Sequence, residues 1–317
     1  MIKDLEIQNF KSIKHLKLDC KKINIFIGEP NTGKSNILES LGVFCFSFGA
    51  PKDFVRFENM SNLFYDNDLG EVIRIKIGEI ILEIKFENSI FKGTCKEPSY
   101  EFEYDYEGKG VHAGIVEFIR FYKFTKRENF PEKRGDYLFP PSGGNLLSIL
   151  MTNKELKSII GQIFTQYGLK PMFKPQEGKI EVVKQQQDDV LISYPYSLSS
   201  ETLQRIIFYL VAINANKNSI LVFEEIESHT FPYYTKFLAE EIAMDENNNQ
   251  YFISTHNPYF LLSILEKANK EEIGIFITYF QDYQTKVKSL NEKDIEEIMD
   301  MGIDVFFNID RFLEVEK

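Results

Sequence analysis

The apolar residues at the start of the chain alternate with polar ones, at the period of two that is typical of half-buried strands. Residues 5–20 carry this pattern on both sides of a turn, NFKS, at Asn9 to Ser12. A largely apolar run over residues 23–27 predicts a buried strand, and the spacing over residues 36–41 predicts a helix. Further alternating runs between Glu71 and Tyr106 predict an antiparallel sheet.

A different pattern begins at about residue 111. Apolar residues at helical spacing over residues 115–122 predict a helix, and more helices are expected between the Pro/Gly stretch at 140–144 and Tyr167. The segments EVVK and VLIS lie on either side of the polar turn QQQDD, residues 185–189, and predict a hairpin.

Strands and helices alternate in the last third of the chain. The four segments are a strand at Ser219 to Phe223, a helix at Phe231 to Ala243, a strand at Gln250 to Ser254 and a helix at Pro258 to Leu265. This alternation indicates parallel strands joined by crossover helices, and we expect the strand over residues 23–27 to join their sheet. A hairpin over residues 273–290 and a helix over residues 292–301 are expected to follow.

These elements predict an α/β fold, in which a mixed sheet with a parallel core is combined with an antiparallel sheet and a smaller helical lobe. We expect residues 1–110 to form the first part of one lobe and residues 111–216 to form the helical lobe. Residues 217–317 are then expected to return to the first lobe.

Composition limits the classes of function. The chain has 317 residues, 43% of them hydrophobic, which is ample for a packed core. Its net charge of -11 argues against a surface that binds nucleic acid everywhere, although a local basic patch remains compatible with it. Three widely spaced cysteines imply neither a disulfide framework nor a zinc site, and no apolar run approaches the length of a membrane span. We therefore expect a soluble, cytoplasmic protein that does not enter a membrane.

The stretch GEPNTGKS, Gly28 to Ser35, fits the phosphate-binding pattern G-x-x-x-x-G-K-[ST]. It lies between a predicted strand and a predicted helix, as that pattern requires. Glycines allow the backbone N–H groups to point at phosphate oxygens, and the start of the helix adds a positive dipole end. Lys34 is then expected to reach the β- and γ-phosphates and Ser35 to bind Mg²⁺. The alternative is a glycine-rich turn with an exposed lysine.

Polar residues follow two of the buried strands. Glu224 and Glu225 come directly after an apolar run, and His256 follows the next strand along the chain. The carboxyl ends of parallel strands form the ligand-binding edge of an open sheet. Glu224 could therefore hold Mg²⁺, Glu225 could activate water, and His256 could donate a hydrogen bond to the γ-phosphate or to that water. The alternatives are solvated acids and a surface histidine.

Together these segments resemble the motifs of the ATP-binding-cassette (ABC) ATPases of the RecF and SMC type, a class that includes the ATPase heads of OLD-type and RecF proteins. NFKS followed by IFIGEPNTGKSN resembles the opening strands and the Walker A motif, and ILVFEE resembles Walker B with its catalytic glutamate. STHNP resembles the switch histidine loop, and EIESHTFP resembles the segment that runs into the D-loop at a dimer interface. The resemblance implies a P-loop ABC-ATPase head.

The resemblance also implies roles for individual residues. It implies ATP and Mg²⁺ as cofactors, with Ser35 and Glu224 as metal ligands. The implied catalytic residues are Lys34, Glu225, His256 and Ser199. The implied nucleotide contacts are Gly28, Glu29, Pro30, Asn31, Thr32, Gly33, Lys34, Ser35, Asn36, Lys11 and Ser12.

The signature motif of the family resembles Ser197 to Thr202, just before a helical run. In the family this serine approaches the γ-phosphate held by the other subunit, so the resemblance implies an ATP-dependent homodimer. Glu201 stands where a glycine is usual, and Glu224 replaces the usual Walker B aspartate. An ordinary helix cap by Ser199 or Ser200 is the alternative interpretation. No Q-loop glutamine occurs over residues 50–70, where Asn59 and Asn62 are weak substitutes.

The resemblance implies an ATPase in DNA maintenance or in defence against foreign DNA. The chain has no heptad stretch long enough for SMC arms, and too few residues follow the histidine loop for a nuclease domain, so any nuclease or other effector would be a separate protein. The first alternative is a slow or non-hydrolysing ATP-dependent switch that recruits a partner, and the second is the ATPase subunit of a transporter.

Residues 121–137 are a candidate DNA contact, because basic and aromatic side chains together can hold phosphates and stack on bases. The cations are Lys123, Lys126, Arg127, Lys133 and Arg134, and the aromatic residues are Phe121, Tyr122, Phe124 and Phe130. Interspersed acidic residues dilute the charge. A solvated loop over a core helix is the alternative.

Overall fold

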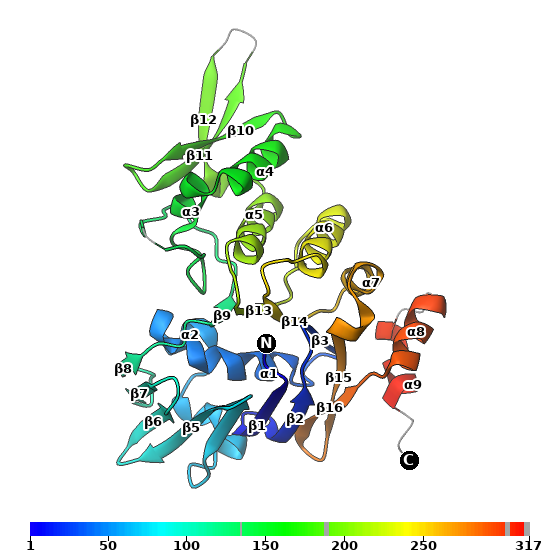
Figure 1. Ribbon diagram of the computed structural model, residues 1–317. Helices are drawn as coiled ribbons and strands as arrows, with labels where there is room; N and C mark the ends of the chain where they lie inside the picture. The colour runs from blue at the N-terminus through cyan, green and yellow to red at the C-terminus, as the bar shows by residue number, and fades with distance from the viewer. Residues whose placement is uncertain (134, 187–189, 302–304, 314–317) are drawn as a thin grey trace.

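The computed structural model describes residues 1–133, 135–186, 190–301 and 305–313, and Figure 1 shows the arrangement of the elements. A six-stranded sheet lies at the centre. Its order is β16 (Gln284–Ser289), β15 (Ile273–Gln281), β3 (Ile23–Gly28), β14 (Gln250–Ser254), β13 (Ile220–Glu224) and β9 (Ile119–Tyr122). All neighbouring pairs are parallel except β15 and β16, so the predicted parallel core and terminal hairpin are confirmed.

The alternating segments of the first part form an antiparallel sheet. Its order is β2 (Ile13–Asp19), β1 (Asp4–Phe10), β4 (Ile73–Ile77), β5 (Ile80–Glu87), β6 (Ile90–Cys95), β7 (Tyr100–Tyr104) and β8 (Gly110–Gly114). The register places Ile7 opposite Leu16 on one side and opposite Ile75 on the other, and all three side chains are buried. The period of two thus places one apolar face of the sheet in the core.

Helix α1 (Lys34–Gly42) lies between the two sheets. Its residues Ile37, Leu38 and Leu41 share one hydrophobic core with Ile7 of the antiparallel sheet and Phe252 of the central sheet. The short helix α2 (Pro51–Phe54) contributes to the same core. Because α1 follows the phosphate loop directly, this packing holds the loop at one edge of the central sheet.

The other face of the central sheet is covered by α5 (Glu201–Asn214), α6 (Pro232–Ala243) and α7 (Pro258–Lys267). Helices α3 (Leu146–Thr152) and α4 (Lys154–Thr165) accompany a small antiparallel sheet. Its strands are β10 (Leu169–Lys174), β11 (Lys179–Gln185) and β12 (Leu191–Pro195). This part extends away from the central sheet in Figure 1 and forms the smaller lobe.

The remaining elements are short or lie near the C-terminus. They are α8 (Glu292–Met301), α9 (Ile309–Leu313) and the 3-10 helices η1 (Val43–Phe48), η2 (Met60–Leu63), η3 (Tyr65–Asn67), η4 (Tyr196–Leu198), η5 (Lys270–Glu272) and η6 (Val305–Phe307). The helix expected over residues 292–301 is confirmed as α8.

One of the expected elements is wrong, and two further expectations concern nearby strands. The helix expected over residues 115–122 is wrong, because residues 119–122 form β9, which is buried throughout and pairs with β13. Strand β8 spans residue 111 in the antiparallel sheet and β9 joins the central sheet, whereas the lobe boundaries expected after residues 110 and 216 stay predictions. The hairpin expected around residues 185–189 is confirmed by the antiparallel pairing of β11 with β12, and β10 adds a third strand. Residues 187–189 of its turn lie outside the described residues.

Candidate nucleotide-binding site

Two glycines shape the phosphate loop between β3 and α1. Gly28 and Gly33 have φ of 147° and 97°, a region that favours glycine. A Cβ on Gly28 would lie 2.4 Å from the carbonyl oxygen of Thr278, and a Cβ on Gly33 would lie 2.0 Å from Oγ1 of Thr285. Strands β15 and β16 therefore approach the loop so closely that only glycine fits at either position.

Lys34 begins α1 and is held inside the loop. Its Nζ donates hydrogen bonds to the carbonyl oxygens of Gly28 at 2.8 Å and Glu29 at 2.7 Å. The residue is only 6% exposed, which contradicts the alternative of an exposed lysine. Burial lowers the pKa of Lys34 to about 8, although the charges of Glu225 and Glu224 oppose the shift. A loop of this shape, with a buried cation and a helix start, fits the phosphates of a nucleotide.

Hydroxyl groups brace the loop from behind. Oγ1 of Thr32 lies 2.7 Å from Oγ1 of Thr278 and donates to the carbonyl oxygen of Glu29 at 2.8 Å. Oγ of Ser12 lies 2.6 Å from Oγ1 of Thr285 and accepts a hydrogen bond from Nδ2 of Asn36 at 2.7 Å. Ser12 and Asn36, two of the expected nucleotide contacts, are thus hydrogen-bonded to each other.

The rest of the loop faces outward. Glu29, Pro30 and Asn31 are exposed, and Asn31 has φ of 63°. Ser35 is half-buried in the first turn of α1. These residues are available to a ligand, whereas Lys34 and the backbone of the glycines form the wall behind it.

Glu224 ends β13 and Glu225 begins the following turn. Glu225 has φ of 46°, and its N–H donates to the carbonyl oxygen of Ser254 at 3.0 Å. Its Oε1 lies 3.3 Å from Nε2 of His256, and its Oε2 accepts a hydrogen bond from Ser228 at 3.1 Å. The predicted carboxylate and histidine are therefore in contact, at the carboxyl ends of β13 and β14.

His256 is half-exposed beside these charges. Its pKa is lowered from the ordinary value, first because burial disfavours the imidazolium and second because Lys34 is positive; the charge of Glu225 opposes the shift. The ring is consequently neutral at neutral pH. In this form one nitrogen can donate a hydrogen bond and the other can accept one.

Arg56 and Glu39 also belong to the site, although neither lies in one of the sequence motifs. Nε of Arg56 lies 2.6 Å from Oε1 of Glu39, and its Nη2 lies 3.3 Å from Oε1 of Glu224. Glu39 is buried in α1 and also pairs with Nζ of Lys11, which donates to the carbonyl oxygen of Arg56 at 2.6 Å. The available signal in the sequence was Glu39 itself, a glutamate on the inner face of α1, because a buried carboxylate is expected to have a charged partner.

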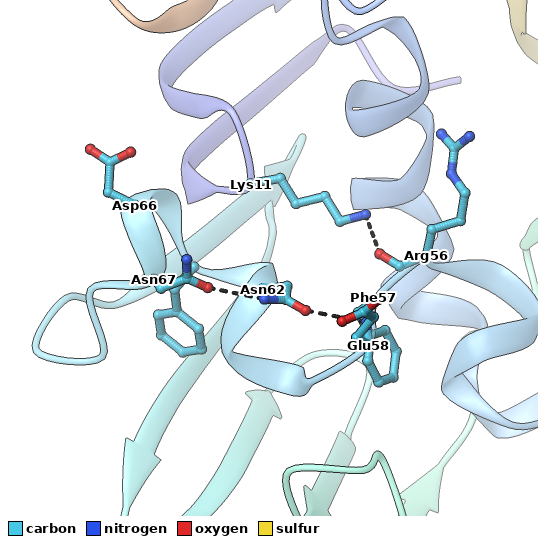
Figure 2. A pocket seen from close by; sticks show the side chains of 8 residues that line it. Lys11, Arg56, Phe57, Glu58, Asn62, Asp66 and Asn67 are labelled. Carbon is cyan, nitrogen blue, oxygen red and sulfur yellow. Dashed lines mark hydrogen bonds between the residues drawn. The ribbon is translucent and has the colours of Figure 1, made fainter.

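An open cavity of about 650 Å³ lies beside this ion-pair group. It is lined by Lys11, Arg56, Phe57, Glu58, Asn62, Phe64, Asp66 and Asn67. In Figure 2, Lys11 reaches toward Arg56, and Asn62 lies between Glu58 and Asn67, with its Nδ2 donating to Asn67 at 3.1 Å. The Oδ1 atoms of Asn62 and Asn59 accept backbone hydrogen bonds at the start of η2, so these residues serve as local caps.

The signature segment lies at the start of α5. Oγ of Ser199 donates to the carbonyl oxygen of Tyr196 at 2.7 Å, and Ser200 makes no side-chain hydrogen bond as the N-cap of α5. The alternative of an ordinary serine cap is therefore wrong. Glu201 pairs with Arg205 at 2.8 Å, and this hydrogen bond lowers the pKa of the carboxyl.

Within the described residues, no hydrogen bond or ion pair joins Ser199 or Glu201 to the phosphate loop. The segment is instead tied to the turn after β13, because Oγ1 of Thr202 donates to the carbonyl oxygen of His229 at 3.0 Å. The structure thus brings Lys34, Glu224, Glu225 and His256 together and leaves Ser199 apart from them.

In the candidate DNA contact, the described cations are at least partly exposed, whereas most of the aromatic rings are buried. Phe121, Tyr122 and Phe130 are buried, and Phe124 packs partly buried against Phe208 and under Arg205. Lys123, Lys126 and Lys133 are exposed and Arg127 is half-buried. Arg134 lies outside the described residues. Base stacking by these rings is therefore excluded in this arrangement, whereas phosphate contacts by the cations are not.

Few protein side chains are placed to bind Mg²⁺ at this site. The described residues contain no group of three or more His, Cys, Asp or Glu side chains arranged for a metal. Mg²⁺ at nucleotide sites is commonly held by one or two protein oxygens together with phosphates and water. Ser35 and Glu224 match this donor set in chemistry.

Among the described residues, no helix is both long and apolar enough to cross a bilayer.

Comparison with known proteins agrees with this geometry. Residues 1–139 match the family model of an AAA ATPase domain, and residues 148–263 match the model of an AAA domain described as "putative AbiEii toxin, Type IV TA system". The two matches together cover most of the chain.

Two curated proteins share shorter segments. The DNA replication and repair protein RecF of Clostridioides difficile (strain 630) is 34% identical over 86 residues, which is 26% of this chain and 23% of RecF. An ATP/GTP phosphatase of Helicobacter pylori (strain ATCC 700392 / 26695) is 35% identical over 88 residues, 24% of each protein. The alignments span about a quarter of the length of these relatives.

The fold is that of an SMC head. A crystal structure of the SmcHead bound to the C-winged helix domain of ScpA superposes with a TM-score of 0.55 at 15% identity, covering 92% of this chain and 98% of that chain. At this identity the likeness concerns the fold alone. The two family matches support an ATPase of the AAA type, and the shared segment and the fold make the chain similar to RecF and to SMC heads.

Proposed function

We propose that the protein binds Mg²⁺-ATP at Gly28 to Ser35 and hydrolyses the bond between its β- and γ-phosphates, releasing ADP and phosphate. The observation that carries this proposal is the meeting of a buried lysine, two glutamates and a histidine at one edge of the central sheet. Lys34 would stabilise charge on the phosphates, and Ser35 and Glu224 would hold the metal. The bound metal would neutralise negative charge that develops on the phosphate oxygens.

Glu225 is proposed as the general base, because its carboxylate is half-exposed and can accept a proton from water. The neutral ring of His256 lies 3.3 Å from this carboxylate and can donate a hydrogen bond to the same water or to the phosphate. Arg56 compensates the charge of Glu224 before a metal binds. Glu224 and Glu225 would thus have separate roles, set by their different partners.

The cavity in Figure 2 is proposed to receive the nucleoside half of the ligand. Lys11, an expected nucleotide contact, lines it, and Arg56 connects its wall to Glu224. Phe57 offers apolar surface for a base, and Asn62, Asp66 and Asn67 offer polar groups for its edge. Such a mixture of apolar and polar side chains is typical of small-molecule sites.

ATP is further proposed to hold two subunits together, with Ser199 and the start of α5 completing the site of the other subunit. Support comes from the start of α5, where no side chain caps the free N–H groups. Glu201 does not oppose this arrangement strongly, because its carboxylate is paired with Arg205.

The biological output is proposed to be DNA maintenance or defence against foreign DNA in the cytoplasm, through a separate effector. The shared segment with a DNA replication and repair protein supports this, as does the partner domain bound to the similar SMC head. The exposed Lys123, Lys126 and Lys133 are the proposed phosphate contacts if DNA is bound directly.

A turnover assay with purified protein tests hydrolysis. The wild type should release phosphate from Mg²⁺-ATP, and Lys34→Ala should not, which also controls for contaminating ATPases. Binding of ATP without turnover by the wild type would overturn hydrolysis and favour a nucleotide-dependent switch instead.

A further inference from the structure

Glu227 is a buried glutamate that the proposed chemistry does not use. It lies in the turn between β13 and α6, and its side chain is directed inward, so that the residue is only 6% exposed. Its Oε1 accepts hydrogen bonds from Oγ1 of Thr255 at 2.5 Å and from the N–H of His256 at 3.3 Å. The side chain therefore joins the turn that carries Glu225 to the loop that carries His256.

Thr255, the hydrogen-bond partner of Glu227, makes further hydrogen bonds of its own. The N–H of Thr255 donates to the carbonyl oxygen of Phe26 in β3, the strand that leads into the phosphate loop, at 3.1 Å. Oγ1 of Thr255 also accepts a hydrogen bond from the N–H of Asn257 at 3.0 Å, and Asn257 caps α7. Glu227 is thus connected through one hydroxyl group to β3 and to the start of α7.

The turn around Glu227 is anchored at several further points. The carbonyl oxygen of Glu227 accepts a hydrogen bond from Oγ1 of Thr230 at 2.6 Å, and the N–H of Glu225 is bonded to Ser254 of β14. Glu225 has a positive φ, which is uncommon for a non-glycine residue and persists only where the surroundings enforce it. The link through Glu227 is a further contact between this turn and the loop after β14.

The other oxygen of the carboxyl group has an unusual environment. Oε2 of Glu227 is buried and has no hydrogen-bond partner among the described residues. Burial of this kind disfavours a charge and raises the pKa of Glu227 to about 7, with Glu225 as a nearby negative group. A neutral carboxyl, protonated at Oε2, keeps Oε1 free to accept both hydrogen bonds.

We propose that Glu227 is a positioning residue, which fixes the imidazole of His256 against the carboxylate of Glu225 by bonding both Thr255 and the backbone of His256. This inference rests on the proposed hydrolysis for its effect on rate, but the placement of His256 can be measured without turnover. The contact that depends on it is the 3.3 Å approach of Nε2 of His256 to Oε1 of Glu225.

Three variants and one control test the proposal. Glu227→Ala removes the link, Glu227→Gln retains an acceptor of the same shape, and Thr255→Val removes the donor hydroxyl while keeping the side-chain volume. Glu246→Ala, at an exposed glutamate, is the matched control. Nucleotide affinity, kcat and KM for Mg²⁺-ATP, and the NMR titration of His256 are measured for each, with His256→Asn to assign the signal.

Glu227→Ala should lower kcat by about 10-fold or more while KM and ATP affinity change little, because the loss falls on orientation in the transition state. Its His256 pKa should move up toward the ordinary value of about 6.5 as the loop loosens. Glu227→Gln should restore most of both properties. Thr255→Val should have a smaller effect that does not add to that of Glu227→Ala, since both act on one link.

Several results would overturn the proposal. These are a kcat of Glu227→Ala no lower than that of Glu246→Ala, a glutamine variant as impaired as the alanine variant, or an unchanged His256 titration in every variant. If Glu227→Ala does not fold, Glu227→Gln and Thr255→Val still decide the question. If the wild type shows no turnover, hydrolysis fails, and the His256 titration alone then judges the positioning role.

Discussion

The phosphate loop and the signature segment differ in how much of their surroundings this chain supplies. The loop is enclosed: Lys34 bonds two of its carbonyl oxygens, Thr278 bonds Thr32, and Thr285 lies against Gly33. The signature segment is open. The hydroxyl group of Ser199 donates within its own turn, and the neighbouring Leu198 is 70% exposed.

This contrast separates two kinds of site. A loop braced from behind can bind phosphates within one subunit, because its backbone geometry is set before the ligand arrives. The start of α5 has no side-chain cap and an exposed apolar neighbour, which supports the proposed role at the site of a second subunit. We therefore expect changes in the loop to act on the monomer and changes in the signature segment to act on assembly.

The largest effect is expected from Glu225→Gln. Glutamine keeps the shape of the side chain but cannot take a proton, so hydrolysis should slow by about 10²- to 10⁴-fold while ATP still binds. The state before hydrolysis should then accumulate as a dimer, visible by light scattering with Mg²⁺-ATP and absent without it.

Ser199→Arg added to Glu225→Gln provides the matching control for the open site. The dimer should be lost while each monomer still binds ATP. A mass that stays monomeric with ATP bound to Glu225→Gln, or a dimer indifferent to Ser199→Arg, would contradict the division between an enclosed and an open site.

Lys34→Ala should lower ATP affinity by about 100-fold, because the loop loses its one side-chain cation and a charge-assisted hydrogen bond. Nucleotide titration measures this, with Lys286→Ala at the hairpin as a control that leaves affinity unchanged. Near-normal affinity of Lys34→Ala would mean that the enclosed loop is not the phosphate site.

The pH dependence of ATP binding should report on the same lysine. Burial lowers the pKa of Lys34 to about 8, so the fraction of protein with a charged lysine falls as pH rises through this value. ATP affinity should therefore decline above about pH 8, by up to about 10-fold for each further pH unit. Lys34→Arg should abolish that decline, since guanidinium stays charged; the same pH profile in both proteins would assign the change to another group.

The smallest effect is expected from Glu201→Gly. The Glu201 side chain is 54% exposed and paired with Arg205, so it should repel phosphates only weakly. The trapped dimer of Glu225→Gln should become only slightly tighter when glycine replaces Glu201, as measured by its dissociation constant. A large gain would show that Glu201 turns toward the phosphates when two subunits meet.

The motifs of the site were predictable because each depends on neighbours in the sequence. A glycine at a left-handed position, a strand before it and a helix after it specify the phosphate loop, and these features lie within a few residues. Glu224, Glu225 and His256 were equally readable, since each follows a buried strand and parallel strands end at the same edge.

The contacts between these motifs could not be predicted, because residues far apart in the chain make them. Arg56 reaches Glu224, and Glu227 reaches Thr255, only after α1 and the two strands have packed. Lys11 was expected at the nucleotide, but its pairing with a buried Glu39 depends on how the antiparallel sheet meets α1.

Residues 119–122 show what sequence pattern alone leaves undecided. A short apolar run fits a helix or a buried strand equally well, and the free edge of β13 decides for a strand by offering backbone hydrogen bonds. That pairing buries Phe121 and Tyr122, which removes them as candidates for base stacking. The sequence by itself determined the phosphate loop, the acids and the histidine; tertiary packing decided their partners, because long-range contacts depend on the order of strands in the sheet.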